Sequence, residues 1–140
     1  MIRVRACLLI ALLTLTLTLP AKADIAIVVE AGSGVGQLTR SEVVNIFMGR
    51  YRKLPNGNPA LPLDVAPLKV RFYRALVNKN LAEINAYWAR LVFSGEASPP
   101  QQVTTAVEMR QLVAHNPSAV GYLDSREVGD DLHVVLILSE

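Results

Sequence analysis

The fold is decided by the stretch Asp24-Ile25-Ala26-Ile27-Val28-Val29-Glu30, a run of mostly β-branched residues that predicts a buried strand. A glycine-rich loop follows it, and beyond that loop the apolar spacing switches between short strands and amphipathic helices. Further strands are expected at 61–65, 120–124 and 132–138, and helices at 39–48, 68–78, 81–93 and 104–115. This order predicts an α/β fold: a mixed, partly parallel sheet flanked by helices, with at least one parallel pair of strands.

Three local features refine this expectation. Pro62 confines the strand at 61–65 to an edge of the sheet or to a strand's first residues. The segment 98–100 contains two prolines and predicts an extended break between helices. The strand at 132–138 is nearly all apolar, which predicts a central place in the sheet.

The composition fits one compact domain. Of 140 residues, 51% are hydrophobic and 19% are charged, which excludes an intrinsically disordered chain. The chain has eight glycines, eight prolines and one cysteine, so collagen-like and disulfide-scaffold proteins are excluded as well.

The first 23 residues predict a cleaved secretory signal peptide. Arg3 and Arg5 precede an apolar stretch, and Ala21-Lys22-Ala23 supplies the small-x-small pattern of a cleavage site. An uncleaved membrane anchor is the alternative, but about 15 apolar residues are short for a span that needs roughly 20. We therefore expect a periplasmic protein whose single folded domain covers 24–140.

Removal of this segment changes the charge of the protein. The full chain has 14 Lys and Arg against 12 Asp and Glu, whereas 24–140 carries one more acidic than basic side chain. A basic protein that binds nucleic acid is therefore not expected. Cys7 would leave with the signal, so the folded domain must be stable without a disulfide.

The sequence gives little support for catalysis. Only His115 and His133 are present, their spacing does not suit a shared metal ion, and no nucleophile–base motif stands out. We expect no enzyme activity, no metal and no cofactor.

Two features could bind a small anion. The loop containing Ser33 and Gly34 lies between a strand and a helix that Thr39 can cap, and backbone N–H groups in that arrangement can hold an anion. Arg50 and Arg71 belong to two groups of basic side chains that could converge on a phosphate or a carboxylate. The alternatives are a plain flexible connection for the loop and a solvated basic face for the two groups.

Several local patterns occur in a fixed order along the chain. The segment L-T-R-S-E-V-V-N-I-F-M-G-R at 38–50 resembles a helix of the phosphate-type periplasmic substrate-binding proteins, the solute receptors of phosphate ABC transporters. A turn at Asn56-Gly57, a Pro-containing strand at 61–63, Arg71-Phe72, and a late A-V-G-Y-L at 119–123 match further pieces of that family. The resemblance implies a type 2 periplasmic-binding-protein fold, here a small member with about one lobe.

One family motif has no counterpart. The anion-binding segment R-[ST]-D-x-S-G-T should lie between the short strand and Arg71-Phe72, where this chain has L-D-V-A-P-L-K at 63–69. The Ser-Gly-Thr donors are missing, and Asp64 is the only echo of the motif. No phosphate-binding residue of that motif carries over.

Two functions follow as hypotheses. The first is a periplasmic module that binds phosphate or a similar small anion for ABC transport, with Ser33, Gly34, Thr39, Arg50 and Arg71 as candidate ligand residues. The second is a receptor-derived interaction or sensory lobe that docks on a membrane permease, a sensor, another periplasmic partner or a second copy of itself without tight ligand binding.

Overall fold

The structure is a computed structural model that describes residues 22–140. The predicted signal peptide lies outside the described residues, apart from Lys22 and Ala23. Within 22–140, no helix combines the length and the apolar character that a membrane crossing requires.

A five-stranded sheet organises the described residues, and its strands run in the order β3-β2-β4-β1-β5. Strand β2 is parallel to both β3 and β4, whereas β1 is antiparallel to both β4 and β5. The predicted α/β class, with a mixed and partly parallel sheet, is therefore confirmed. The strands are β1 (Ile25–Glu30), β2 (Leu61–Val65), β3 (Gln101–Val103), β4 (Ala119–Asp124) and β5 (Leu132–Leu138).

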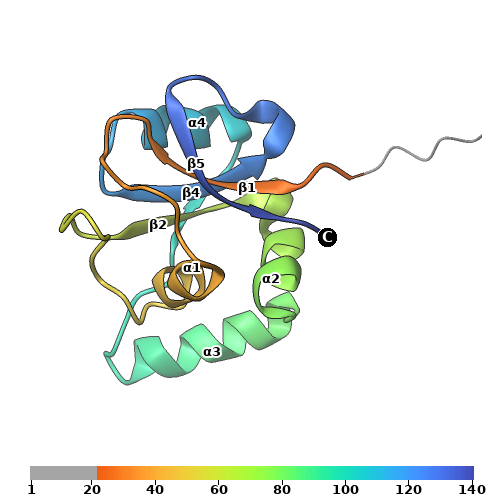
Figure 1. Cartoon of the computed structure of the whole chain (residues 1–140). Coiled ribbons are helices and arrows are strands. Elements are labelled where there is room, and N and C mark those ends of the chain that lie inside the picture. Colours follow the sequence, from red (N-terminus) through yellow and green to blue (C-terminus); the bar gives the residue numbers. More distant parts are fainter. Residues whose placement is uncertain (1–21) are drawn as a thin grey trace, which may run out of the picture.

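The helices cover both faces of this sheet. Figure 1 shows α1, α2 and α3 on one side and α4 on the other. Each helix lies within two residues of its predicted bounds, because each has a clear apolar stripe. The helices are α1 (Arg40–Phe47), α2 (Lys69–Val77), α3 (Leu81–Phe93) and α4 (Ala106–Ala114), and the short 3-10 turns are η1 (Ala66–Leu68) and η2 (Ser125–Glu127).

Strand β5 lies at an edge of the sheet, so its predicted central position is wrong. The edge tolerates an apolar strand because the chain before α1 runs along it. Leu38 donates its backbone N–H to the Val135 carbonyl at 3.0 Å, and the Gln37 side chain donates to the Val134 carbonyl. Val135 is the extra residue where the register with β1 shifts, which turns its carbonyl away from β1.

Strand β3 was not predicted: its three residues directly follow the extended break expected at 98–100 and were assigned to no element. It pairs in parallel with β2, so β2 is an interior strand. Pro62 is the second residue of β2, which agrees with the start position allowed by the sequence.

An aromatic cluster fills the core between the sheet and helices α1 and α2. The rings of Phe72 and Tyr122 are stacked, with centroids 3.7 Å apart and planes 6° from parallel. Phe47 packs edge-on against Phe72 at 4.7 Å, and Tyr73 packs against Phe72 at 4.9 Å. All four side chains are fully buried, so this cluster fixes α1 and α2 against β4.

Helix α4 approaches β4 most closely at Gly121. A Cβ atom built on Gly121 would collide with Met109 Sδ and would lie 3.2 Å from Val113 Cγ2. The glycine in the A-V-G-Y-L segment is therefore required by packing, since only hydrogen fits beneath the helix.

We expect Gly121→Ala to lower the free energy of unfolding by about 1–3 kcal/mol, because the added methyl overpacks the contact between α4 and β4. Urea unfolding measures this change. Gly36→Ala is the matched control, because no atom lies within 4 Å of a Cβ there. An equal effect of the two substitutions would contradict the packing argument.

Candidate functional site

The parallel strands β2, β3 and β4 end at the same edge of the sheet. In open α/β sheets, ligands bind beyond the carboxyl ends of such strands. A cavity of about 160 Å³ lies there, between the ends of β2 and β4 and the start of α4. Its lining residues are Val65, Pro67, Leu68, Ala106, Asp124 and Glu127.

The strand-end cavity is poorly suited to an anion. One wall consists of apolar side chains from the end of β2 and from η1, and Pro67 has no backbone N–H to donate. Two carboxylates, Asp124 and Glu127, face the same space. The N-terminus of α4 is already occupied, because Thr105 accepts from Glu108 N and the Glu108 carboxylate accepts from Thr104 N.

Asp64 lies directly beneath this edge and is buried, with 2% of its surface exposed. The hydroxyl of Tyr73 donates to its Oδ1 at 2.9 Å, and the hydroxyl of Tyr122 donates to the same atom at 3.0 Å. Lys69 Nζ lies 3.6 Å from Oδ2 and also donates to Gln102 at 3.2 Å. Asp64 therefore binds residues of its own fold, and sequence reasoning missed this cluster although an aspartate in an apolar strand was a signal.

Burial and hydrogen bonding act in opposite directions on the Asp64 carboxyl. Desolvation raises its pKa, and the donors Tyr73, Lys69 and Tyr122 only partly offset that effect. Desolvation and the neighbouring carboxylate also raise the pKa values of Tyr73 and Tyr122 strongly, so both hydroxyls stay protonated as donors.

The charged groups at the strand ends pair with one another. Arg126 forms a two-pronged ion pair with Asp124, at 3.0 Å to Oδ1 and 2.8 Å to Oδ2, which lowers the pKa of Asp124 to about 2. Arg71 forms a similar pair with Glu140, at 2.9 and 2.7 Å, and donates to the Ala23 carbonyl at 2.8 Å. Arg71 is thus held by a carboxylate of the chain itself.

The other predicted anion residues lie in separate surroundings. Thr39 caps α1: its hydroxyl accepts from Glu42 N at 3.1 Å, and the Glu42 carboxylate accepts from Thr39 N at 2.7 Å. In the loop, Ser33 accepts from Val35 N, and Gly34 adopts a positive φ of 76°. Arg50 is exposed and donates to Asn45 at 3.3 Å.

These five residues do not form one site through direct bonds. No hydrogen bond between residues 22 and 140 joins any two of them. The α1 N-terminus, which could have received an anion, already holds the Glu42 carboxylate. Their role in ligand binding stays a prediction.

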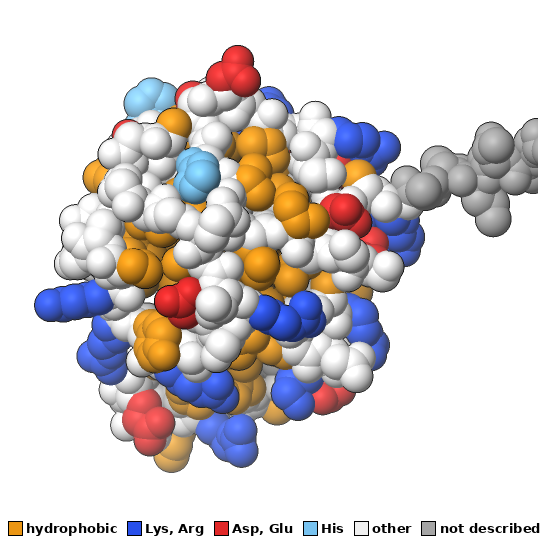
Figure 2. Space-filling view, viewed as in Figure 1, with side chains coloured by type: hydrophobic (Ala, Val, Ile, Leu, Met, Phe, Trp, Pro, Cys, Tyr) orange, Lys and Arg blue, Asp and Glu red, His pale blue; other side chains and the backbone are white. Residues whose placement is uncertain are grey.

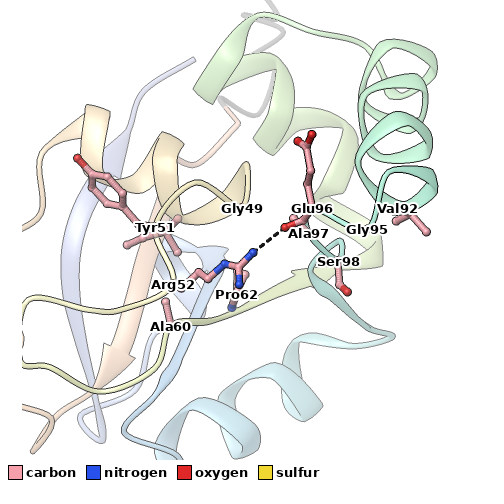
Figure 3. Close-up of a pocket in the computed structure, with 11 residues that line it drawn as sticks. Gly49, Tyr51, Arg52, Ala60, Pro62, Val92, Gly95, Glu96, Ala97 and Ser98 are labelled. Atoms are coloured by element: carbon pink, nitrogen blue, oxygen red, sulfur yellow. Dashed lines mark hydrogen bonds between the residues drawn. The ribbon is translucent and has the colours of Figure 1, made fainter.

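A larger cavity of about 400 Å³ lies on the side of the molecule occupied by α1 and α3. It is bounded by the segment that follows α1, the start of β2 and the segment that follows α3 (Figure 3). Arg52 crosses it and donates to the Glu96 carbonyl at 2.6 Å, whereas the Glu96 carboxylate points away. The lining residues are Ile46, Gly49, Tyr51, Arg52, Ala60, Pro62, Val92, Gly95, Glu96, Ala97 and Ser98.

Sequence reasoning placed Arg50 in a group of basic side chains but did not predict this cavity. Its walls come from 46–62 and 92–98, two stretches separated by about 30 residues that the sequence alone does not bring together. Gly49 is the one sequence feature that marks a wall of this cavity. It has a φ of 76°, and Trp88 packs directly against it. Within residues 22–140, no group of three His, Cys, Asp or Glu side chains is placed to hold a metal ion.

Comparison with known proteins supports the fold. No protein-family model matches the sequence, and no curated protein matches it. Among solved structures, an ABC-type phosphate transport receptor from Vibrio cholerae matches with a TM-score of 0.57 and 18% identity, over 81% of this chain and 45% of that one. A structure from Clostridium perfringens, described as a phosphate ABC transporter substrate-binding protein with bound phosphate, matches with a TM-score of 0.62 and 17% identity, over 81% and 44%.

The chain therefore has the fold of phosphate-type substrate-binding proteins and spans less than half the length of the two that it matches. The resemblance inferred from the order of motifs is confirmed at the level of the fold.

We expect the contribution of Asp64 to the free energy of unfolding to fall as the pH rises. Its pKa lies above the ordinary 3.8 in the folded chain, so the folded state binds the proton more tightly than the unfolded state. This stabilisation is complete below about pH 4 and is lost as the pH rises through the raised pKa. Urea unfolding from pH 3 to pH 8 should show the stability of the wild type falling relative to Asp64→Asn.

Asp124→Asn is a control of opposite sign. The Asp124 pKa of about 2 lies below its ordinary value, so its contribution is present above about pH 4 and is lost as the pH falls towards 2. A constant difference between wild type and Asp64→Asn across the pH range would contradict the role assigned to burial.

Proposed function

We propose that this chain is a non-catalytic, substrate-binding-protein-like module that is exported to the periplasm and acts by contacting a partner protein. The fold supports the class of module, since the chain resembles phosphate-type receptors over most of its length. Export is inferred from the signal peptide expected at 1–23. A membrane permease or a membrane sensor is the partner that this class of protein suggests.

One observation carries the choice of contact over ligand enclosure: the anion donors of this chain bind the chain itself. Arg71 binds Glu140, and Thr39 binds Glu42. At the strand ends, Arg126 binds Asp124. A phosphate removed from water needs many charge-assisted donors, and each of these would first have to leave a carboxylate or a backbone group.

The strand-end cavity also argues against the enclosure of phosphate. It measures about 160 Å³ and has two carboxylates on an otherwise apolar wall. A dianion there would be repelled by Glu127 and would meet an Asp124 that is already paired with Arg126, and the Ser-Gly-Thr donors of the family motif are absent from 63–69.

Phosphate binding is the second candidate function. It is favoured by the likeness to a structure described as having phosphate bound. The exposed Arg50, whose only side-chain bond within 22–140 is a long one to Asn45, is the candidate residue least engaged in the fold.

We expect isothermal titration of the purified protein with inorganic phosphate, at millimolar concentration and low salt, to give no saturable heat. Phosphate would have to displace the internal carboxylates, which are held at higher effective concentration. Saturable binding that is weakened by Arg50→Ala or Arg71→Ala would contradict a function based on protein contact alone. It would establish phosphate binding, the second candidate function. Arg74→Ala, on the same helix as Arg71, is the matched control.

We expect the partner contact to be detected by photo-crosslinking in the periplasm. A photoreactive residue is placed singly at Val70, Phe93, Leu112 or Ile137, four exposed apolar positions on different elements. At least one position should give an adduct with a discrete membrane or periplasmic protein, because a working contact buries part of the surface. Exclusive recovery of uncrosslinked monomer from all four variants would contradict the proposed function.

A further inference from the structure

Three of the eight large apolar side chains exposed within 22–140 lie at or next to the larger cavity. Phe93, the last residue of α3, is 95% exposed, and its neighbour Val92 is 54% exposed. Tyr51, on the opposite wall, is 48% exposed. Val92 and Tyr51 line the cavity (Figure 3), and Phe93 follows Val92 at the end of α3. We call the hollow and these three side chains the α3-end surface.

The α3-end surface is concave, and side chains of the folded domain form the base of its hollow. Its base is formed by Ile46, Ala60 and Pro62, and Gly49 allows Trp88 to pack against the wall from beneath. Arg52 is fixed across the hollow by its 2.6 Å bond to the Glu96 carbonyl. A hollow of about 400 Å³ accommodates one large side chain of a binding partner.

Exposed basic side chains neighbour the lining residues of this surface in the sequence. Arg50 directly precedes Tyr51, Lys53 follows Arg52, and Arg90 lies in the last turn of α3, two residues before Val92. Glu96 is the acidic exception, and its carboxylate points away from the hollow in Figure 3. Positive charge therefore lies close to the exposed Val92 and Phe93, and Arg52 adds a further guanidinium inside the hollow.

Basic and acidic side chains of the domain are separated along the sequence, and the basic part includes the α3-end surface. Between Arg40 and Glu96 the chain has nine Lys and Arg against four Asp and Glu, whereas 24–39 and 97–140 together have two against eight. The first region forms the side with α1, α2 and α3. In Figure 2, most Lys and Arg side chains on the visible face lie over that half of the molecule.

From this combination we propose that the α3-end surface is the docking site for an acidic polypeptide segment that inserts one large apolar side chain into the hollow beside Phe93. The proposal rests on the proposed function and names the surface and the partner chemistry. Acidic side chains of the segment pair with Arg50, Lys53 and Arg90, while Phe93 and Val92 cover the inserted side chain.

The concave shape favours a polypeptide over a lipid surface. A bilayer is locally flat and would contact the protruding Phe93 without filling the hollow behind it. A polypeptide can place a side chain in the hollow and its carboxylates on the rim at the same time. Binding to anionic vesicles is therefore a separate outcome of the test.

The experiment selects binders from a random twelve-residue peptide library displayed on phage, with the purified protein as bait. We expect the selected peptides to combine Asp and Glu with one Leu, Phe or Trp. Their affinity, measured by fluorescence anisotropy, should fall about tenfold with Phe93→Ser and with Arg90→Glu. Both residues are exposed, so neither change should prevent folding; Leu112→Ser on α4 is the matched control and should leave affinity unchanged.

Three results would overturn the inference. One is selection of peptides without acidic residues; another is affinity that is insensitive to Phe93→Ser and Arg90→Glu. The third is co-sedimentation with phosphatidylglycerol vesicles that Phe93→Ser abolishes, which would make the surface a membrane contact. Photo-crosslinking separates this inference from the proposed function. Adducts only at Val70, Leu112 or Ile137 would overturn the docking site but leave a protein contact, whereas adducts at Phe93 support both.

Discussion

The structure depends on a buried carboxylate that must be satisfied from within the fold. Asp64 is on β2, and its hydrogen-bond donors come from α2 through Tyr73 and from β4 through Tyr122. An unpaired charge at this depth would cost several kcal/mol, so the three elements are fixed at the distance that lets both hydroxyls reach it. The stacked rings of Phe72 and Tyr122 then add apolar contact to the same arrangement.

This constraint also explains why the edge at the carboxyl ends of the parallel strands has few hydrogen-bond donors left for a ligand. The position where α/β proteins place a ligand lies over a cluster in which carboxylate, hydroxyls and ammonium are already matched with one another. Above it, Arg126 and Asp124 neutralise each other. The donors are therefore used to consolidate the domain, and the chemistry available at this edge for a ligand is mostly apolar and acidic.

Most of the fold could be predicted from the sequence because its elements have clear local signals. The stripe on 81–93 and the β-branched run at 24–30 match α3 and β1 directly. The place of β5 in the sheet could not be predicted, since its apolar residues are shielded by the chain at Gln37 and Leu38, a tertiary contact nearly 100 residues away in sequence. Strand β3 is too short for any period to be visible.

The candidate site was less predictable, for a specific physical reason. Sequence reasoning identifies side chains that can bind an anion, but it does not show whether another part of the chain occupies them. The capping box of Thr39 and Glu42 spans three residues and is readable as a T-x-x-E pattern. The pairing of Arg71 with Glu140 spans 69 residues and appears only in three dimensions.

The near-neutral charge of residues 24–140 conceals a strong separation between two sides of the molecule. Separated charge of this kind orients a molecule as it approaches a charged partner and raises the rate of productive encounters. It adds little affinity, because exposed ion pairs are screened by salt. Affinity must then come from apolar area, and the part of the surface where an exposed aromatic ring, a hollow and the basic side coincide is the end of α3. The chain thus pairs its charges at the carboxyl ends of the parallel strands, whereas Arg50, Lys53 and Arg90 on the helical side form no ion pair among residues 22–140.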